Sequence, residues 1–268
     1  MVNGGQLLSA TFGKGDAGDI ILNIDETALF DGVDPFVHVF PSSAASSIEP
    51  GGEGTAGDVL VNARNLEIVN GAQIDSATDG IGDAGNVILR VDENLRIGGE
   101  TTSTGSTSAV FSGSRDNGTG SGGDIRITST SLQFENGSLS AASLTEDSGN
   151  IILSVEDIIS LAEGRIETSS FSASGGEVKI KARGIQLEEN SDISTFVIQG
   201  DGGGGNITVQ ADYAIALDDS DILAFAADGR GGDINFRETA FFGQNYQPVD
   251  VAILRTELGD YAPEFTQA

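Results

Sequence analysis

One short pattern organises this sequence: a glycine, then Asp, Asn or Glu, then a β-branched apolar residue, repeated eight times along the chain. Five of the seven intervals between its glycines measure 26 to 29 residues, and the other two measure 38 and 39. A period in this range indicates stacked structural repeats, none of which can bury its apolar face alone. The glycines, called the anchor glycines below, are Gly18, Gly57, Gly85, Gly123, Gly149, Gly176, Gly205 and Gly232.

The unit that starts at Gly57 contains three stretches in which apolar or small residues alternate with polar ones. Alternation with a period of two indicates half-buried strands, and Asn70-Gly71 is a turn signal before the third stretch. No unit has the apolar spacing of a helix, so we predict an all-β fold. The expected inward residues are Val59, Val61 and Ala63, then Leu66 and Ile68, then Ile74, Ser76 and Thr78.

Three short strands in each coil, each paired with the same strand of the next coil, form a parallel β-helix. We expect this solenoid to be right-handed, because parallel crossover connections almost always are, and to contain about eight to nine coils of about 27 residues. A β-propeller is the alternative fold, but its blades need about 40 to 45 residues. Because the repeat fades after Phe236, we predict the solenoid over residues 1–238 and an irregular C-terminal cap or tail over 239–268.

The two long intervals predict insertion loops near residues 33–54 and 99–120, both between the second and third strands of a coil. Insertions on one side of a solenoid often form its binding face. Surface loops also tolerate extra length at little thermodynamic cost, so harmless surface length is the alternative. The candidate contact residues in these loops are Phe36, His38, Phe40 and Phe111.

The chain is strongly acidic, since 13 Lys and Arg against 41 Asp and Glu give a formal charge of −28. This balance argues against nucleic acid and anionic membrane surfaces as partners, because both need a basic face. The absence of cysteine excludes disulfides, thiolate metal sites and cysteine nucleophiles. No apolar run approaches the roughly 18 residues of a membrane span.

The residues that follow the anchor glycines would form a column along the stack. Asp and Asn side chains in such positions bond neighbouring backbone amides, and stacked amides form ladders. We therefore expect no cofactor. The alternative is calcium held between coils, because oxygen ligands suit a hard cation. Its candidate ligands are Asp19, Asp58, Asp124 and Asp233.

We find no catalytic residues to name and predict that the chain is not an enzyme. His38 is the only histidine, so the sequence lacks the residues for catalytic triads or metal clusters that need several histidines. Two alternatives remain open. One is a polysaccharide lyase or hydrolase built on a β-helix, with carboxylates clustered in a groove. The other is a calcium-stabilised structural module.

Three groups of segments share recognisable repeat sequences: Asn70–Thr78 with Gly82–Leu89, Asp31–Val33 with Phe40–Ala44, and Ser220–Ala226 with Gly231–Ile234 and Phe242-Gly243. These segments resemble the repeats of large cyanobacterial exoproteins of the filamentous-haemagglutinin type. The resemblance covers roughly residues 1–243 and rests on the repeat pattern, so it is specific for fold and broad for function.

The resemblance implies a secreted or cell-surface adhesive protein exported by two-partner secretion, with an outer-membrane transporter serving the full-length parent. It implies contacts with a cell-surface polysaccharide or protein, and an extracellular or outer-surface location. Asn3–Ser9 aligns with residues 70–76, late in a repeat unit, and the first residues lack the features of a signal peptide. We therefore expect this chain to be a segment of a longer exoprotein.

Overall fold

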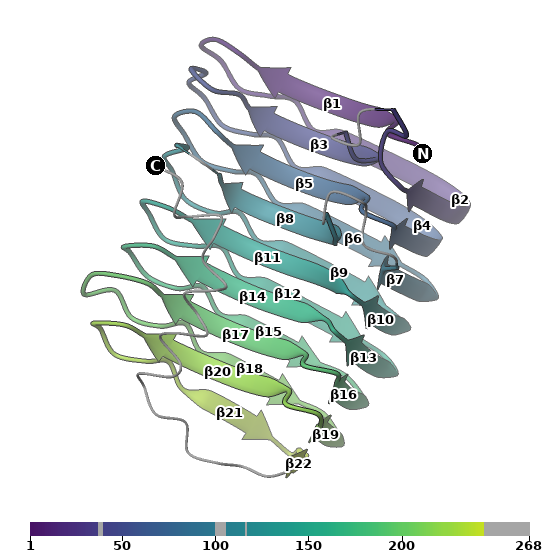
Figure 1. The fold of residues 1–268 in the computed structure, drawn as a ribbon, viewed down its shortest axis with the longest axis vertical. Coiled ribbons are helices and arrows are strands. Elements are labelled where there is room, and N and C mark those ends of the chain that lie inside the picture. The colour runs from purple at the N-terminus through teal and green to yellow at the C-terminus, as the bar shows by residue number, and fades with distance from the viewer. Residues whose placement is uncertain (37–39, 100–105, 116, 244–268) are drawn as a thin grey trace.

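The computed structural model describes residues 1–36, 40–99, 106–115 and 117–243, and these residues contain strands and no helix. The strands stack into a parallel β-solenoid of about seven turns with a spacing of about 29 residues (Figure 1). The prediction of an all-β parallel solenoid is therefore confirmed.

Three columns of strands run along the stack, and we call them faces 1, 2 and 3. Face 1 contains the first strand of each turn and belongs, together with face 2, to one 14-stranded sheet. Face 1 consists of the first halves of β2 (Ile20–Asp31) and β4 (Val59–Val69), then β6 (Val87–Val91), β9 (Ile125–Ser129), β12 (Ile151–Val155), β15 (Val178–Lys181), β18 (Ile207–Gln210) and β21 (Ile234–Arg237).

Face 2 contains the second strand of each turn. From β6 onwards this strand is separate from the first, whereas β2 and β4 each run through both faces, which is why the two faces share a sheet. Face 2 consists of the second halves of β2 and β4, then β7 (Asn94–Gly98), β10 (Ser131–Glu135), β13 (Ile158–Ala162), β16 (Gly184–Glu188), β19 (Tyr213–Ala216) and β22 (Ala240–Gly243).

Face 3 is a separate sheet of eight strands and contains the third strand of each turn. It lies toward the viewer in Figure 1. Its strands are β1 (Gln6–Thr11), β3 (Ser43–Ile48), β5 (Gln73–Thr78), β8 (Ser108–Ser114), β11 (Gly137–Ser143), β14 (Arg165–Ser170), β17 (Asp192–Val197) and β20 (Asp221–Ala226).

The core is a stack of β-branched and leucine side chains from all three faces. Because the strands pair in register, equivalent inward residues lie directly above one another, and the first inward position of face 1 is fully buried in six consecutive turns. Burial of one such side chain stabilises the fold by about 1.5 to 3 kcal/mol. The residues of this column are Val59, Val87, Ile125, Ile151, Val178 and Ile207.

The anchor glycines line up at the corner between face 3 and face 1, which we call the 3–1 corner. A Cβ atom on Gly57 would lie 2.5 Å from the carbonyl oxygen of Gly18, and one on Gly205 would lie 1.7 Å from that of Gly176. These distances are far below van der Waals contact, so successive turns approach too closely for any side chain. Steric exclusion therefore explains the period from which the fold was predicted.

Buried hydroxyl groups of face 3 tie this corner to the interior. Ser76 Oγ donates to the carbonyl oxygen of Gly57 at 2.9 Å and accepts from the N–H of Gly85 at 2.8 Å. Ser46 makes the same pair of bonds with Gly18 and Gly57 in the preceding turn. Buried polar groups need such partners, because an unsatisfied one costs about 1 to 3 kcal/mol. The inward polar residues of the third strand are therefore structural.

The insertions are shorter than the ranges predicted from the sequence. β3 lies inside 33–54 and β8 lies inside 99–120, so both ranges include a strand of face 3. The inward residues Ala44 and Ser46 of β3 are small, which hid the alternation of this strand among other serines and alanines. The insertions proper lie between β2 and β3, and between β7 and β8. At the other end, β22 pairs with β19, so the solenoid continues beyond residue 238.

The first turn differs from the interior turns in the exposure of its apolar residues. Leu7 of β1 occupies an inward register position but is 38 % exposed, whereas its partner Ala44 in the next turn is fully buried. Leu8, Phe12 and Ile21 are also exposed in this turn. A turn packed against a neighbour on one side only therefore leaves part of its apolar surface uncovered.

Candidate contact surface at the corner between faces 2 and 3

The chain turns from face 2 to face 3 through residues with positive φ, and we call this column the 2–3 corner. Left-handed backbone suits Gly and Asn but is uncommon for Glu. The N–H of Asn70 donates to the carbonyl oxygen of Gly98 at 2.8 Å, and that of Asn136 to Ala162 at 2.9 Å, so each corner is hydrogen-bonded to the next turn. The φ values are 56° at Asn70, 94° at Gly99, 57° at Asn136, 51° at Glu163 and 55° at Glu189.

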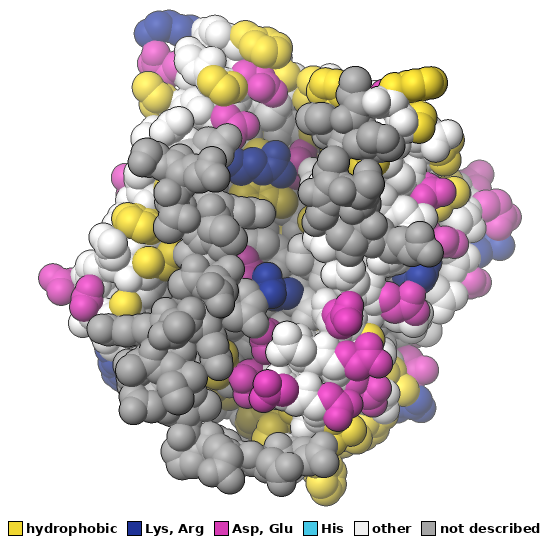
Figure 2. Space-filling model, in the orientation of Figure 1, with side chains coloured by type: hydrophobic (Ala, Val, Ile, Leu, Met, Phe, Trp, Pro, Cys, Tyr) yellow, Lys and Arg dark blue, Asp and Glu magenta, His cyan; other side chains and the backbone are white. Residues whose placement is uncertain are grey.

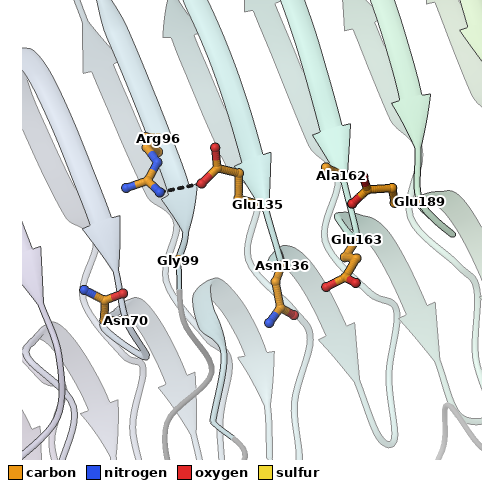
Figure 3. Close-up of a pocket in the computed structure, with 8 residues that line it drawn as sticks. All are labelled: Asn70, Arg96, Gly99, Glu135, Asn136, Ala162, Glu163 and Glu189. Atoms are coloured by element: carbon orange, nitrogen blue, oxygen red, sulfur yellow. Dashed lines mark hydrogen bonds and ion pairs between the residues drawn. The ribbon is translucent and has the colours of Figure 1, made fainter.

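A shallow groove of about 550 Å³ runs along this corner (Figure 3). It crosses several turns of the solenoid, because its walls come from the ends of β4, β7, β10, β13 and β16. The groove is therefore elongated along the stack and open to solvent at its surface. Its lining residues are Asn70, Arg96, Gly99, Glu135, Asn136, Ala162, Glu163 and Glu189.

Toward the N-terminal end of the stack the groove contains an ion pair, and toward the C-terminal end it contains two exposed carboxylates that have no ion pair with a described residue. Arg96 of β7 and Glu135 of β10 point toward one another and form an ion pair at 2.5 Å, and Gln133 Nε2 donates to the other carboxylate oxygen of Glu135 at 2.8 Å. Glu163 and Glu189 follow on the next two turns and are exposed. In Figure 2 acidic side chains gather in the lower right of the view, where Figure 1 places β13, β16 and β19.

This arrangement can accept hydrogen bonds from hydroxyl groups and attract cationic groups through Glu163 and Glu189. It offers little to an anion, because Arg96 is already neutralised by Glu135. Among the described residues no group of three or more His, Cys, Asp or Glu side chains is placed to hold a metal ion. The groove is thus suited to a polar, hydroxyl-bearing surface.

The first insertion leaves the solenoid at the same corner as a short hairpin. Val33 and Pro41 form an antiparallel bridge, the N–H of Asp34 donates to the carbonyl oxygen of Phe40 at 2.8 Å, and that of Ser42 donates to Gly32 at 2.8 Å. Phe36 is 88 % exposed and Phe40 is 52 % exposed. Two candidate contact residues therefore project from the 2–3 corner, while His38 lies outside the described residues.

Phe111 was assigned to the second insertion, and this assignment is wrong. The residue lies within β8 on the outer surface of face 3, between Asp75 of β5 and Ser140 of β11 in the strand register. The guanidinium of Arg115 lies 4.4 Å from the centre of its ring and 2.6 Å from Asp75. Its ring is thus occupied by an intramolecular cation–π contact and does not form a contact loop.

The candidate calcium ligands take part in a ladder of side chains and backbone groups. Asp19 Oδ1 accepts from the N–H of Asp58 at 2.8 Å, and Asp58 Oδ1 accepts from the N–H and the side-chain amide of Asn86 at 2.7 and 3.0 Å. Asp124 Oδ1 accepts two bonds from Asn150 in the same way, and the N–H of Asp233 donates to Asn206 Oδ1. These contacts give the side chains of Asp19, Asp58 and Asp124 a structural role that requires no ion, whereas Asp233 joins the ladder through its backbone.

The sequence reasoning missed the acidic groove, although a signal for it was present. Asn70 and Asn136 each precede a glycine, and this dipeptide favours left-handed turns. Glu163 precedes Gly164 at the equivalent place in its turn, but a Glu-Gly pair carries no comparable turn preference. Alignment of the corners by the positions of the strand ends would have brought the carboxylates together.

Comparison with models of known protein families, with curated proteins and with solved structures finds no match to this chain. In the part of the chain that the structure describes, no helix is long and apolar enough to cross a membrane.

Proposed function

We propose that this chain is a non-enzymatic structural and adhesive segment of a secreted or cell-surface exoprotein of the filamentous-haemagglutinin type, exported by two-partner secretion. The observation that carries the proposal is the hairpin at the 2–3 corner, which presents Phe36 and Phe40 to solvent from a solenoid whose turns are held in register by the parallel sheets. Exposed aromatic residues on a rigid support are typical of contact surfaces, because little side-chain freedom is lost on binding.

The solenoid supplies the rigidity that such a segment needs. Each turn is bonded to its neighbours through the sheets of all faces, the anchor ladder and the buried hydroxyl groups. A partner could be a cell-surface polysaccharide or protein. The parent protein would act outside the cell, and its export would depend on an outer-membrane transporter.

The proposal is tested by adhesion of the purified chain to whole cells of candidate host and sister strains. We expect adhesion to fall at least tenfold in the double variant Phe36→Ser, Phe40→Ser. Phe12→Ser is the matched control, because Phe12 is 72 % exposed on the first turn and lies away from the hairpin. Equal adhesion of the double variant and the native chain would remove the hairpin as the contact surface.

A second candidate function is cleavage of a polysaccharide, and the groove supplies the observation that favours it. Glu135, Glu163 and Glu189 lie on successive turns, and glycoside hydrolysis uses two carboxylates that flank the scissile bond. Incubation with pectin, alginate and host exopolysaccharides tests this function. New reducing ends or unsaturated products that disappear in Glu163→Gln would support the enzyme and contradict a purely adhesive role.

A further inference from the structure

Positive charge on this acidic protein is distributed very unevenly between its faces. The strands of face 1 from β6 onwards carry five outward cations and no carboxylate. The chain as a whole has 41 acidic against 13 basic residues, so a face without any acid is unexpected. The five cations are Arg90, Arg126, Lys179, Lys181 and Arg237.

Ion pairing separates these cations into two groups. Arg126 and Lys179 are neutralised by Asp124 and Glu177, the acids that follow their own anchor glycines. Arg90, Lys181 and Arg237 are exposed and have no ion pair with any residue that the structure describes. Six other cations, on the remaining surfaces, pair with neighbouring carboxylates: Lys14, Arg64, Arg96, Arg115, Arg183 and Arg230.

The three unpaired cations occupy one column of the sheet. The register places one residue of each strand in this column, and it contains neutral polar side chains between the cations and no acid. Parallel strands are about 4.8 Å apart, so Arg90 and Lys181 are about 14 Å apart and Lys181 and Arg237 about 10 Å apart. The column runs Asn23, Asn62, Arg90, Thr128, Ser154, Lys181, Gln210 and Arg237.

A second outward column runs beside the first. Half of its eight residues are apolar, and the others are the ion-paired Arg126 and Lys179 and the neutral Thr208 and Asn235. Its members include Ile21, Leu60, Ile88 and Ile152, and Ile21 is 59 % exposed. Face 1 therefore presents, along the solenoid axis, a line of spaced cations with hydroxyl and amide groups between them, flanked by a column that contains four apolar side chains. We call these two columns the face 1 strip.

We propose that the face 1 strip binds an acidic polysaccharide that lies along the solenoid axis and carries its carboxylates on sugars separated by neutral ones. The cations pair with the carboxylates, the intervening Thr128, Ser154 and Gln210 bond hydroxyl groups, and Ile88 and Ile152 contact the C–H faces of the sugar rings. The assignment presupposes the adhesive role proposed above and names the chemical class of one partner.

The same geometry disfavours a nucleic acid. Double-stranded DNA carries one negative charge for about every 1.7 Å of its axis, which is far denser than the unpaired cations of this column. Asp124 and Glu177 stand at the edge of the strip and would repel such a dense anion. At physiological salt, charges separated by more than about 8 Å are screened, so the strip acts locally despite the negative net charge.

Affinity electrophoresis and calorimetry with hyaluronan, in which uronate alternates with a neutral amino sugar, test the proposal. We expect measurable binding at 50 mM salt, loss of that binding at 500 mM salt, and no binding to neutral dextran. The triple variant Arg90→Gln, Lys181→Gln, Arg237→Gln should bind at least tenfold more weakly. The control triple variant Lys14→Gln, Arg64→Gln, Arg183→Gln makes the same change in net charge outside the two columns of the strip and should bind as the native chain does.

Absence of hyaluronan binding, equal affinity of the strip variant and the native chain, or equal weakening in both triple variants would overturn the proposal. Tighter binding of single-stranded DNA than of hyaluronan would overturn the assigned partner class. Urea unfolding of both variants shows whether the fold is retained. Cell adhesion by the native chain without hyaluronan binding would refute the strip and leave the adhesive function standing, whereas failure of both assays would refute both.

Discussion

The 3–1 corner and the 2–3 corner both turn the chain from one face to the next, but the first accepts only glycine and the second accepts several residue types. At the 3–1 corner successive anchor glycines touch backbone to backbone, and every turn carries the same residue. At the 2–3 corner Asn, Gly and Glu all occupy the left-handed position, and insertions of different length leave from it. Close packing therefore fixes one corner of the solenoid, whereas the other tolerates different residues and loops of different length.

The largest expected effect comes from a side chain at the closely packed corner. In Gly205→Ala the new Cβ would lie 1.7 Å from the carbonyl oxygen of Gly176, so two turns must separate. We expect a loss of about 3 kcal/mol in the free energy of unfolding, measured by urea denaturation. Gly13→Ala is the control, because nothing lies within 4 Å of its added Cβ. A Gly205→Ala chain as stable as the control would contradict the steric account of the period.

Removal of one buried hydroxyl should have the next largest effect. Ser76→Ala leaves the carbonyl oxygen of Gly57 and the N–H of Gly85 without their partner, which predicts a loss of about 2 kcal/mol by thermal or urea unfolding. Ser154→Ala, on the exposed outer surface of face 1, should change stability by less than about 0.5 kcal/mol. Equal effects at the two serines would show that the hydroxyl column does not support the corner.

The anchor ladder predicts a smaller effect that also tests calcium. Asp58→Ala removes the acceptor of two bonds from Asn86 and should lower stability by about 1 kcal/mol. Asp58→Asn keeps an acceptor oxygen and should remain close to the native chain. Melting curves with calcium and with chelator should coincide for the native chain. If calcium raised the melting temperature of the native chain but not that of Asp58→Asn, these residues would form a calcium site and not only a hydrogen-bonded ladder.

At the open corner a substitution should improve stability. Glu163 has a φ of 51°, a conformation that glycine adopts without strain, so Glu163→Gly should stabilise the fold by about 0.5 to 1 kcal/mol. Glu156→Gly is exposed but has no positive φ, and we expect it to destabilise the fold slightly. Destabilisation by both substitutions in chemical denaturation would mean that the left-handed corner is not a source of strain.

The smallest effect is expected for the hairpin. Replacement of residues 34–40 by a two-residue glycine-containing turn should change the free energy of unfolding by less than about 0.5 kcal/mol, because loop length contributes slowly to stability. Circular dichroism and urea denaturation check this. A cooperative loss of the fold would show that the hairpin closes the solenoid, in which case its variants could not report on adhesion alone.

The features that could be predicted from the sequence are those that recur in every turn, as at the 3–1 corner, and the features that were missed vary from turn to turn. The anchor glycines and the alternation of residues such as Val59 and Val61 are imposed on every turn by backbone contact and burial, so they recur in the sequence and the solenoid could be predicted. The strand β3 was taken into an insertion because its inward residues Ala44 and Ser46 are small. Phe111 was misplaced for a related reason, since its strand lies among Ser, Thr and Gly.

The acidic groove and the face 1 strip depend on which residues lie on the same surface in different turns. Glu163 and Glu189 become neighbours only when the strand ends are aligned, and Arg90 and Lys181 share a column only through the pairing of intermediate strands. The intervals between turns are unequal, so sequence separation alone does not align such positions. Surface sites on a solenoid are a property of register more than of composition.

The partial exposure of Leu7 in the first turn has a mechanical consequence. In the isolated chain the first turn contacts a neighbour on one side only, so thermal opening of this chain should start there and advance inward one turn at a time. When one turn opens, the next turn loses its neighbour on that side and becomes the one most easily opened. The interior turns of the solenoid should therefore unfold only after the turns outside them have opened.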